Sequence, residues 1–454
     1  MIILDKAIIV TAEKEAAGTI AIEGNHIKEV LWTDAEDYDF RMGKLLKENP
    51  DAEVWMLEGK HVIAGGIDAH VHFREPGLTH KADMETESKA AVAGGVTTVF
   101  DMPNTKPATI TAEALKAKMD LASGRALTKT AFHIGATNDN VDMICALVRE
   151  GDTQTGIKPD DIPGVKVFMG SSTGNMLVDQ KESLERLFAI KEKPVLVHCE
   201  DEATIKANLA AAIEKYGQDI PFTEHENIRS RRACIKSSIT ALEMAMKHGT
   251  RLVLCHISTK EEAEMARAAK ANNPGITAET SCNYLWFGNE DYDRLGSKVK
   301  CNPAVKSSND KAALRMALAE GTIDTIGSDH APHLLSEKEG TYTEAPSGLP
   351  SIQQSLPVLL TVAHEEEIPL TRIASVFSEN ASDLYNLNRG KIQSGYEADL
   401  VIFDYSKEFV VKAEDQYSKC GWTPYEGVTL RGYIETVFID GKPIMKEGRL
   451  VQNN

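Results

Sequence analysis

The stretch GGIDAHVHFREPG, residues 65–77, places two histidines, an arginine and a glutamate directly after an apolar run. On a β-strand, His70 and His72 point to the same face of the sheet, because successive side chains alternate between the two faces. An isolated pair of this kind is more often a pair of hydrogen-bonded core histidines than a metal site. The rest of the chain therefore has to decide between these two interpretations.

From about residue 62, short apolar runs alternate with longer helical stretches. An example is VTTVFDMP, residues 96–103, followed by TAEALKAKMDLASG, residues 111–124. Near-continuous apolar strands that alternate with helices indicate a parallel sheet covered by helices. Roughly eight such units over about 300 residues fit a (β/α)₈ barrel better than an open sheet.

Short strands with turns precede and follow this region, as in MIILDKAIIV at residues 1–10 and GYIETVFIDG at residues 432–441. We therefore predict an α/β protein with two parts. A small β-sandwich domain is formed from both chain ends, residues 1–61 and 387–454. A metal-dependent (β/α)₈ TIM-type barrel, residues 62–386, is the catalytic domain. The charged segment 34–51 is expected to be a surface insertion.

Three later apolar runs end in candidate metal ligands: His198 in PVLVHCE, His256 in RLVLCHIST and Asp329 in TIGSDHAPH. The active site of such a barrel lies at the carboxyl ends of its strands, so these side chains are expected to meet His70 and His72 there. Four histidines with one aspartate favour Zn²⁺ or a similar ion over Mg²⁺ or Ca²⁺. A strand-end aspartate can ligate a metal ion and also accept a proton from the attacking water.

Lys166 lies inside the apolar run GVKVFMGSS, residues 164–172. A buried lysine is costly unless it is paired or chemically modified. One interpretation is a lysine whose amine reaches solvent. The other is a lysine that carbon dioxide has carbamylated, so that it becomes a carboxylate able to bridge two cations.

The composition limits the partners of the protein. A net charge of −18 disfavours nucleic acid and anionic membranes as partners, and the basic run RSRRACI, residues 229–235, is expected to be a solvated helix face. Seven cysteines without a CxxC pair indicate a reducing compartment. No apolar run approaches the length of a membrane span, so we expect a cytoplasmic protein without membrane contact. The oligomeric state stays open, and a homodimer is the commonest arrangement for a soluble enzyme.

The order HxH, strand lysine, two strand-end histidines and a final aspartate resembles the amidohydrolase superfamily. Within it, the motifs HVHFREPG, MPNT, HIST, CNPAVK and SDHAPH are similar to those of dihydroorotases. The resemblance implies a metal-bearing barrel beside a small β domain. It also implies a zinc-dependent cyclic amide hydrolase that reversibly interconverts dihydroorotate and N-carbamoyl-aspartate in de novo pyrimidine biosynthesis.

The resemblance also implies a role for each site residue. Two zinc ions would be bridged by carbamylated Lys166, one of them bound by His70, His72 and Asp329 and the other by His198 and His256. A hydroxide between the metals would be the nucleophile, with Asp329 as general base and acid. The residues implied in binding this small-molecule substrate are Arg74, Asn104 and His333 at its carboxylate, and Asn302 and the backbone around Gly348 at its ring amides.

Two positions depart from patterns seen in the family. The family commonly has NPPLR where this chain has NPAVK, so Lys306 replaces an arginine. Some dihydroorotases have an aspartate at the bridging position, whereas this chain has Lys166. Glu75 is assigned to structure, at the turn around Pro76. The polar loop SSTGNMLVDQ, residues 171–180, is either a lid in which Thr173 contacts substrate or an ordinary loop.

Two alternatives stay open. A hydantoinase or an allantoinase would use the same metal ions, but a hydantoin has no carboxylate for Arg74 and His333 to bind. A non-catalytic homologue could serve as a scaffold in a protein complex. Scaffolds of this kind usually lose metal ligands, whereas all six candidate positions here hold suitable residues.

Overall fold

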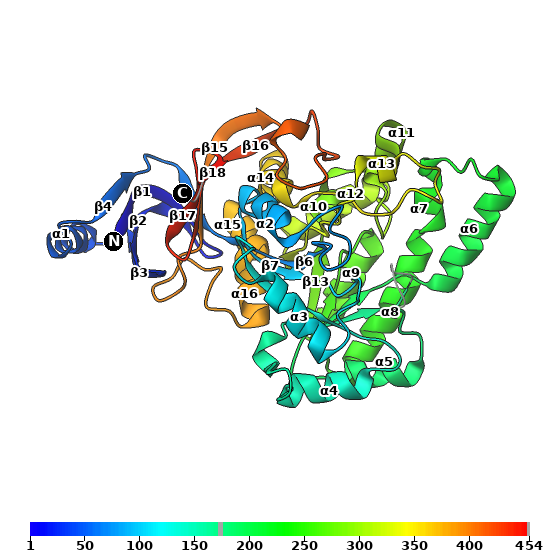
Figure 1. Cartoon of the computed structure of the whole chain (residues 1–454). Coiled ribbons are helices and arrows are strands. Elements are labelled where there is room, and N and C mark those ends of the chain that lie inside the picture. Colours follow the sequence, from blue (N-terminus) through cyan, green and yellow to red (C-terminus); the bar gives the residue numbers. More distant parts are fainter. Residues whose placement is uncertain (171–175, 452–454) are drawn as a thin grey trace.

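The computed structural model describes residues 1–170 and 176–451. A barrel surrounded by helices forms the larger body of the molecule, and a smaller β lobe lies at one end of it (Figure 1). The loop predicted to carry a lid contact, with Thr173, lies outside the described residues.

Parallel strands form the barrel in the described part of the chain. They are β6 (Gly66–Val71), β7 (Val96–Asp101), β8 (Lys129–Phe132), β9 (Ile134–Gly135), β10 (Val165–Phe168), β11 (Val195–His198), β12 (Leu252–Leu254), β13 (Ile276–Thr280) and β14 (Thr325–Ile326). Strands β6, β7 and β8 pair in that order, and the pairing continues from β9 to β14. Because β8 runs into β9 after one residue, the two fill one barrel position.

The barrel closes between its first and last strands. Val71 and His330 form a parallel bridge, and the backbone N–H of His72 donates to the His330 carbonyl at 2.8 Å. Together with the helices, this closure confirms the predicted (β/α)₈ barrel.

Helices cover the outside of the barrel, as Figure 1 shows. The main ones are α2 (Met84–Ala93), α3 (Ala112–Ala122), α4 (Val141–Glu150), α5 (Lys181–Phe188), α6 (Glu202–Tyr216), α8 (Arg231–His248), α9 (Lys260–Lys270), α12 (Ser308–Ala319) and α14 (Ser355–Glu365). Local sequence sets where several of them begin. The side chain of Asp83 caps α2, and Thr259 forms a capping box with Glu262 at the start of α9.

The smaller lobe contains strands from both chain ends. They are β1 (Ile2–Val10), β2 (Glu15–Glu23), β3 (His26–Trp32), β4 (Glu53–Met56), β5 (His61–Ala64), β15 (Leu400–Val410), β16 (Thr429–Ile439), β17 (Lys442–Lys446) and β18 (Arg449–Leu450). Their order is β18-β17-β16-β15-β5-β1-β2-β3, with β4 on β1. The antiparallel pair β5–β15 joins the two ends of the chain, as predicted. The predicted limits of the two domains stay a prediction.

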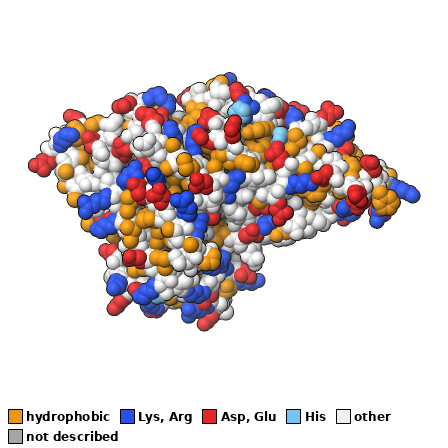
Figure 2. All heavy atoms as spheres, turned by 180° about the vertical axis from the view of Figure 1, so that it is seen from behind, with side chains coloured by type: hydrophobic (Ala, Val, Ile, Leu, Met, Phe, Trp, Pro, Cys, Tyr) orange, Lys and Arg blue, Asp and Glu red, His pale blue; other side chains and the backbone are white. Residues whose placement is uncertain are grey.

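The charged insertion at residues 34–51 contains a helix, α1 (Tyr38–Glu48). Leu45 anchors it by packing against Ile3, Ala21 and Leu31 of the sheet. On the face shown in Figure 2, acidic and basic side chains are interspersed. No helix in residues 1–170 and 176–451 has the length and hydropathy needed to cross a membrane.

A buried ion pair anchors the segment that follows the HxH motif. Asp101, at the end of β7, accepts a hydrogen bond from the backbone N–H of Phe73 at 2.7 Å. The Lys118 amine lies 2.6 Å from Asp101 Oδ2 and donates to the Met102 carbonyl at 2.8 Å. The side chains of Asp101 and Lys118 are both completely buried. Burial lowers the pKa of Lys118, and the charge of Asp101 opposes that shift.

We predict that Lys118→Met destabilises the protein by about 3–5 kcal/mol, because it leaves the Asp101 carboxylate buried without a cation. Thermal unfolding followed by circular dichroism measures the change. Lys116→Met is the matched control, because Lys116 pairs with Asp120 on the exposed face of the same helix. Exposed ion pairs contribute little, so the control should melt near the wild type. Equal melting temperatures for both variants would contradict the assigned role of Lys118.

Candidate active site

The predicted site residues meet in one cavity at the carboxyl ends of the barrel strands. Ten of them line it, namely His70, His72, Arg74, Asn104, Lys166, His198, His256, Asn302, Asp329 and Gly348. The remaining one, His333, lies behind Arg74 and contacts its guanidinium. The barrel thus brings together residues that lie far apart in the sequence, as we predicted from their positions at strand ends.

The first donor group consists of His70, His72 and Asp329. Asp329 Oδ1 lies 3.0 Å from His72 Nε2 and 3.5 Å from His70 Nε2. Burial alone would raise the pKa of Asp329, but the contact with His72 and the neighbouring histidines outweigh it and lower that pKa. Asp329 is therefore a carboxylate that faces two imidazole nitrogens.

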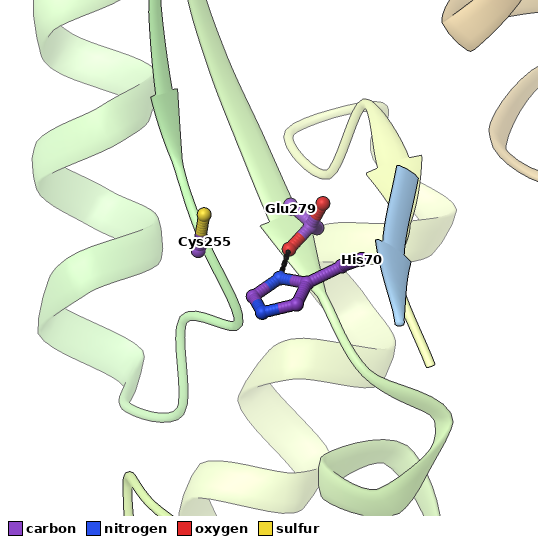
Figure 3. Close-up of side chains that lie close together, drawn as sticks. All are labelled: His70, Cys255 and Glu279. Carbon is purple, nitrogen blue, oxygen red and sulfur yellow. Dashed lines mark hydrogen bonds and ion pairs between the residues drawn. The ribbon is translucent and has the colours of Figure 1, made fainter. Parts of the chain in front are cut away.

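Each of these two histidines is oriented through its other nitrogen. His70 Nδ1–H donates to Glu279 Oε1 at 2.7 Å, as the dashed line in Figure 3 shows. His72 Nδ1–H donates a hydrogen bond to Asn104 Oδ1 at 2.8 Å. Such outer partners fix the tautomer of a metal-binding histidine.

The orientation leaves lone pairs facing one another. In a neutral imidazole whose Nδ1 is protonated, Nε2 carries a lone pair. The lone pair of His72 Nε2 then faces the negative oxygen of Asp329 at 3.0 Å. Two acceptors at that distance require a cation between them, either a proton, as in the pairing that lowers the pKa of Asp329, or a metal ion. Because His70 Nε2 faces the same Asp329 oxygen as a third donor, the geometry fits a metal ion.

The second donor group is formed by His198 and His256. His198 Nε2–H donates to Glu200 Oε2 at 2.9 Å, so its Nδ1 presents a lone pair to His256 Nε2 at 3.0 Å. His256 Nδ1 is buried without a hydrogen-bond partner in the described part of the chain. Burial lowers the pKa of both histidines, which keeps them in the neutral form that binds metal.

A buried carboxylate and arginine support this second group. Arg229 donates to Glu200 Oε2, with Nη2 at 2.5 Å and Nε at 3.1 Å, and only 8% of Arg229 is exposed. The prediction that RSRRACI forms a solvated helix face is therefore wrong for Arg229. In the sequence, nothing distinguishes Arg229 from Arg231 and Arg232, whereas the fold places Arg229 against Glu200.

Lys166 lines the same cavity as the two donor groups. Its amine is fully buried and donates to Cys255 Sγ at 3.2 Å. It also lies 5.1 Å from the centre of the Phe168 ring. The Lys166 amine thus contacts a thiol and an aromatic ring, and its charge opposes the rise that burial causes in the pKa of Glu279. One ligand atom each of Cys255, His70 and Glu279 lies within 4.8 Å of the others, and Figure 3 shows the three side chains together.

The cationic end of the site contains Arg74, His333 and Lys81. Arg74 Nε donates to the Pro332 carbonyl at 3.1 Å, and its Nη2 lies 3.0 Å from His333 Nε2. Lys81 Nζ donates to His333 Nδ1 at 2.9 Å. Burial, followed by the charges of Arg74 and Lys81, lowers the pKa of His333. Burial also lowers the pKa of Arg74, to about 10.

The neutral imidazole of His333 cannot satisfy all of its neighbours. Its one lone pair, on Nδ1, accepts from Lys81. Its N–H, on Nε2, then donates to the Ser347 carbonyl at 3.1 Å. The Arg74 Nη2 group therefore faces an N–H rather than an acceptor. This arrangement leaves Arg74 suited to bind an anion that enters the cavity.

Two further predicted contacts, Asn302 and Gly348, also line the cavity. Asn302 Oδ1 is buried and lacks a hydrogen-bond partner among the described residues. Gly348 has a φ of 129°, and a Cβ there would lie 2.6 Å from the Ala331 carbonyl oxygen. The Gly348 N–H already donates to the Lys300 carbonyl at 2.9 Å. The Gly348 carbonyl oxygen accepts from Lys338 Nζ at 2.8 Å and keeps a second lone pair with which it could bind a ligand.

Sequence reasoning missed Glu279, Glu200 and Lys81. A signal existed for Glu279, because it is a charged residue inside the apolar run ITAET. Glu75 is structural as expected, but its carboxylate accepts from the Met84 N–H and from Arg125 rather than acting at the turn.

Lys306, which stands where the family commonly has an arginine, is buried. Its amine donates to the Ala304 carbonyl at 2.8 Å. The cation is thus kept at this position, and it is used to hold the neighbouring backbone.

We predict that Glu279→Ala weakens metal binding by about 10–100-fold, because His70 loses the acceptor that orients it. Competition with a chelator of known affinity measures the effect. Glu279→Gln keeps an acceptor oxygen and should lose much less. If both variants bind metal like the wild type, Glu279 has no orienting role.

Comparison with known proteins places the chain in a family. Residues 61–444 match the model of the amidohydrolase family. A dihydroorotase from Methanosarcina mazei is 34% identical over 400 residues, covering 86% of this chain and 84% of that protein. An allantoinase from Desulfitobacterium hafniense is 30% identical over 411 residues, covering 88% of each.

The fold has a close counterpart among solved structures. An L-hydantoinase (dihydropyrimidinase) from Arthrobacter aurescens has a TM-score of 0.89 at 24% identity, covering 99% of this chain and 97% of that chain. At that identity the likeness concerns the fold. Together with the family match and the donor groups of the cavity, it identifies the molecule: the chain belongs to the amidohydrolase family, as a metal-dependent hydrolase built on a (β/α)₈ barrel.

Proposed function

We propose that the chain is a dihydroorotase, which interconverts dihydroorotate and N-carbamoyl-aspartate. Dihydroorotate is a cyclic amide with one carboxylate. The observation that carries the proposal is Arg74, a buried guanidinium beside the metal-donor groups that the structure leaves without a carboxylate ion pair among the described residues. A substrate carboxylate would complete its hydrogen bonding.

Two zinc ions fit the donor groups of the cavity. His70, His72 and Asp329 would hold one, and His198 and His256 the other. Lys166 would bridge them after its amine has added carbon dioxide and released a proton to form a carbamate. When bound, the ions polarise the scissile carbonyl and lower the pKa of the attacking water.

The side chains around the ions position the substrate. Arg74 binds its carboxylate. Asn104, which lines the cavity beside His72, assists in holding the same carboxylate. The Pro332 carbonyl orients the Arg74 guanidinium by accepting from its Nε at 3.1 Å, and His333 beside it assists in holding the carboxylate. Asn302 Oδ1 and the Gly348 carbonyl accept hydrogen bonds from the ring N–H groups.

Asp329 moves the proton. Its carboxylate, through the oxygen that does not face His70 and His72, accepts a proton from the attacking water and returns it to the ring nitrogen as the amide bond breaks. The lowered pKa of Asp329 supports this role, because the group is ionised before the reaction starts. The reverse sequence closes the ring.

Allantoinase is the second candidate, favoured by the relative from Desulfitobacterium hafniense at 30% identity. Like a hydantoin, allantoin offers no carboxylate to Arg74. A role as a non-catalytic scaffold is disfavoured, because the cavity keeps every donor that the reaction needs.

We expect purified protein to hydrolyse dihydroorotate, followed as the loss of its ultraviolet absorbance, and to lose this activity on chelation. Arg74→Met should lower kcat/KM by at least about 100-fold, since a charged hydrogen-bonded pair contributes about 1.5–3 kcal/mol or more at each contact. Dihydrouracil, the same ring without the carboxylate, is the control substrate. Turnover of hydantoin or allantoin without turnover of dihydroorotate would refute the proposal.

We expect Lys166→Ala to lose bound zinc and activity together, because it removes the bridging group. Elemental analysis measures the metal. Short carboxylic acids added to this variant should restore part of the activity by filling the same space with a carboxylate. A variant with two zinc ions and the full rate would exclude Lys166 as the bridge.

A further inference from the structure

The segment at residues 342–348 borders the cavity, and four of its carbonyl groups accept hydrogen bonds from two buried lysines. Ser347 and Gly348 line the cavity itself. Behind them, the carbonyls of Tyr342 and Ala345 accept from Lys300 Nζ at 2.5 and 2.6 Å. Those of Pro346 and Gly348 accept from Lys338 Nζ at 2.7 and 2.8 Å. Two amines therefore satisfy four carbonyls of this short segment.

Both lysines are buried. Only 7% of Lys300 and 2% of Lys338 is exposed, and neither has an ion-pair partner in residues 1–170 and 176–451. Burial lowers the pKa of Lys338 to about 7 and that of Lys300 to about 8. Burying two ammonium groups without carboxylates is costly, so their hydrogen bonds to the segment have to offset that cost.

The two lysines are linked to each other and to the segment. Lys338 Nζ also lies 3.4 Å from the Lys300 carbonyl, and the Gly348 N–H donates to that same carbonyl at 2.9 Å. Lys300 Nζ lies 4.2 Å from the centre of the Tyr342 ring, and the Tyr342 hydroxyl is 2.8 Å from His225 Nδ1. The contacts thus form one connected unit beneath the cavity edge.

The donor chemistry explains why lysine occupies both positions. An ammonium carries three N–H donors and no acceptor, so one side chain can hold several carbonyls that point to a common centre. A segment with several buried carbonyl groups is unfavourable without such donors, because buried backbone acceptors require hydrogen-bond partners. Removing one amine would leave at least two carbonyls unsatisfied and free the segment to turn.

We propose that Lys300 and Lys338 are positioning residues: they form a clamp that holds Ser347 and Gly348 at the cavity edge, in the conformation that receives the substrate ring. The inference rests on the proposed function, since it takes Gly348 as a substrate contact. Neither lysine touches the metal donors, so the clamp acts on substrate binding and leaves metal binding unchanged.

The test compares Lys300→Met and Lys338→Met with Lys298→Met. Methionine keeps the unbranched side chain and removes the donors. Lys298 lies two residues before Lys300, in the turn η3 (Gly296–Val299), and is the matched control. We expect the two clamp variants to raise KM for dihydroorotate about tenfold or more, with kcat within about threefold and bound zinc unchanged. The double variant should be less than additive, because both lysines hold one segment.

Deuterium exchange supplies a readout that needs no substrate. Peptides covering residues 341–349 should exchange faster in both clamp variants and at the wild-type rate in Lys298→Met. If the wild type fails to hydrolyse dihydroorotate, the proposed function falls, and the exchange experiment still tests the clamp. Folded variants with wild-type KM and exchange would overturn the clamp.

A variant that fails to fold is replaced by Lys300→Gln or Lys338→Gln, which keep two N–H donors. We expect these to fold, with a smaller rise in KM. If they also fail to fold, the lysines belong to the general stability of the barrel, and the proposal is overturned.

Discussion

The closure of the barrel between β6 and β14 is the constraint on which the site depends. Asp68 ties these strands together: its carboxylate accepts from the backbone N–H of His70 at 3.0 Å and of Ser328 at 3.1 Å. This brings His72 within 3.0 Å of Asp329, although 257 positions separate them in sequence. A shift of one residue in this pairing would turn the histidines to the other face of the sheet. The first donor group therefore exists only while the barrel is closed.

The cavity separates two kinds of chemistry. On one side, buried acceptors orient the histidines: Glu279 holds His70, and Glu200, itself paired with Arg229, holds His198. On the other side, Arg74, Lys81, Lys300 and Lys338 gather positive charge. The chain as a whole carries a net charge of −18, yet this end of the cavity is basic. Net charge limits nonspecific partners, whereas a small anion responds to the charges within a few ångströms.

The barrel and its donor set could be predicted because they leave local signals. An apolar strand that ends in a histidine can be recognised from the local sequence alone, since strand alternation and strand ends are local properties. The orienting residues leave no such signal. Arg229 stands in a run of basic residues, and nothing in that run shows that only this one turns inward to Glu200. Lys338 ends the polar run SEK, residues 336–338, which predicts an exposed side chain, but packing leaves only 2% of Lys338 exposed.

The sequence by itself determined the alternation of strands and helices, the return of both chain ends to one sheet, and the residue types at the strand ends. These follow from periodicity and from side-chain chemistry, which each segment carries with it. The tertiary structure decided which nitrogen of each histidine faces the cavity, that the Gly348 N–H is bonded to the Lys300 carbonyl, and which lysines are buried. Those properties depend on partners supplied by other strands, and a partner in space has no fixed position along the chain.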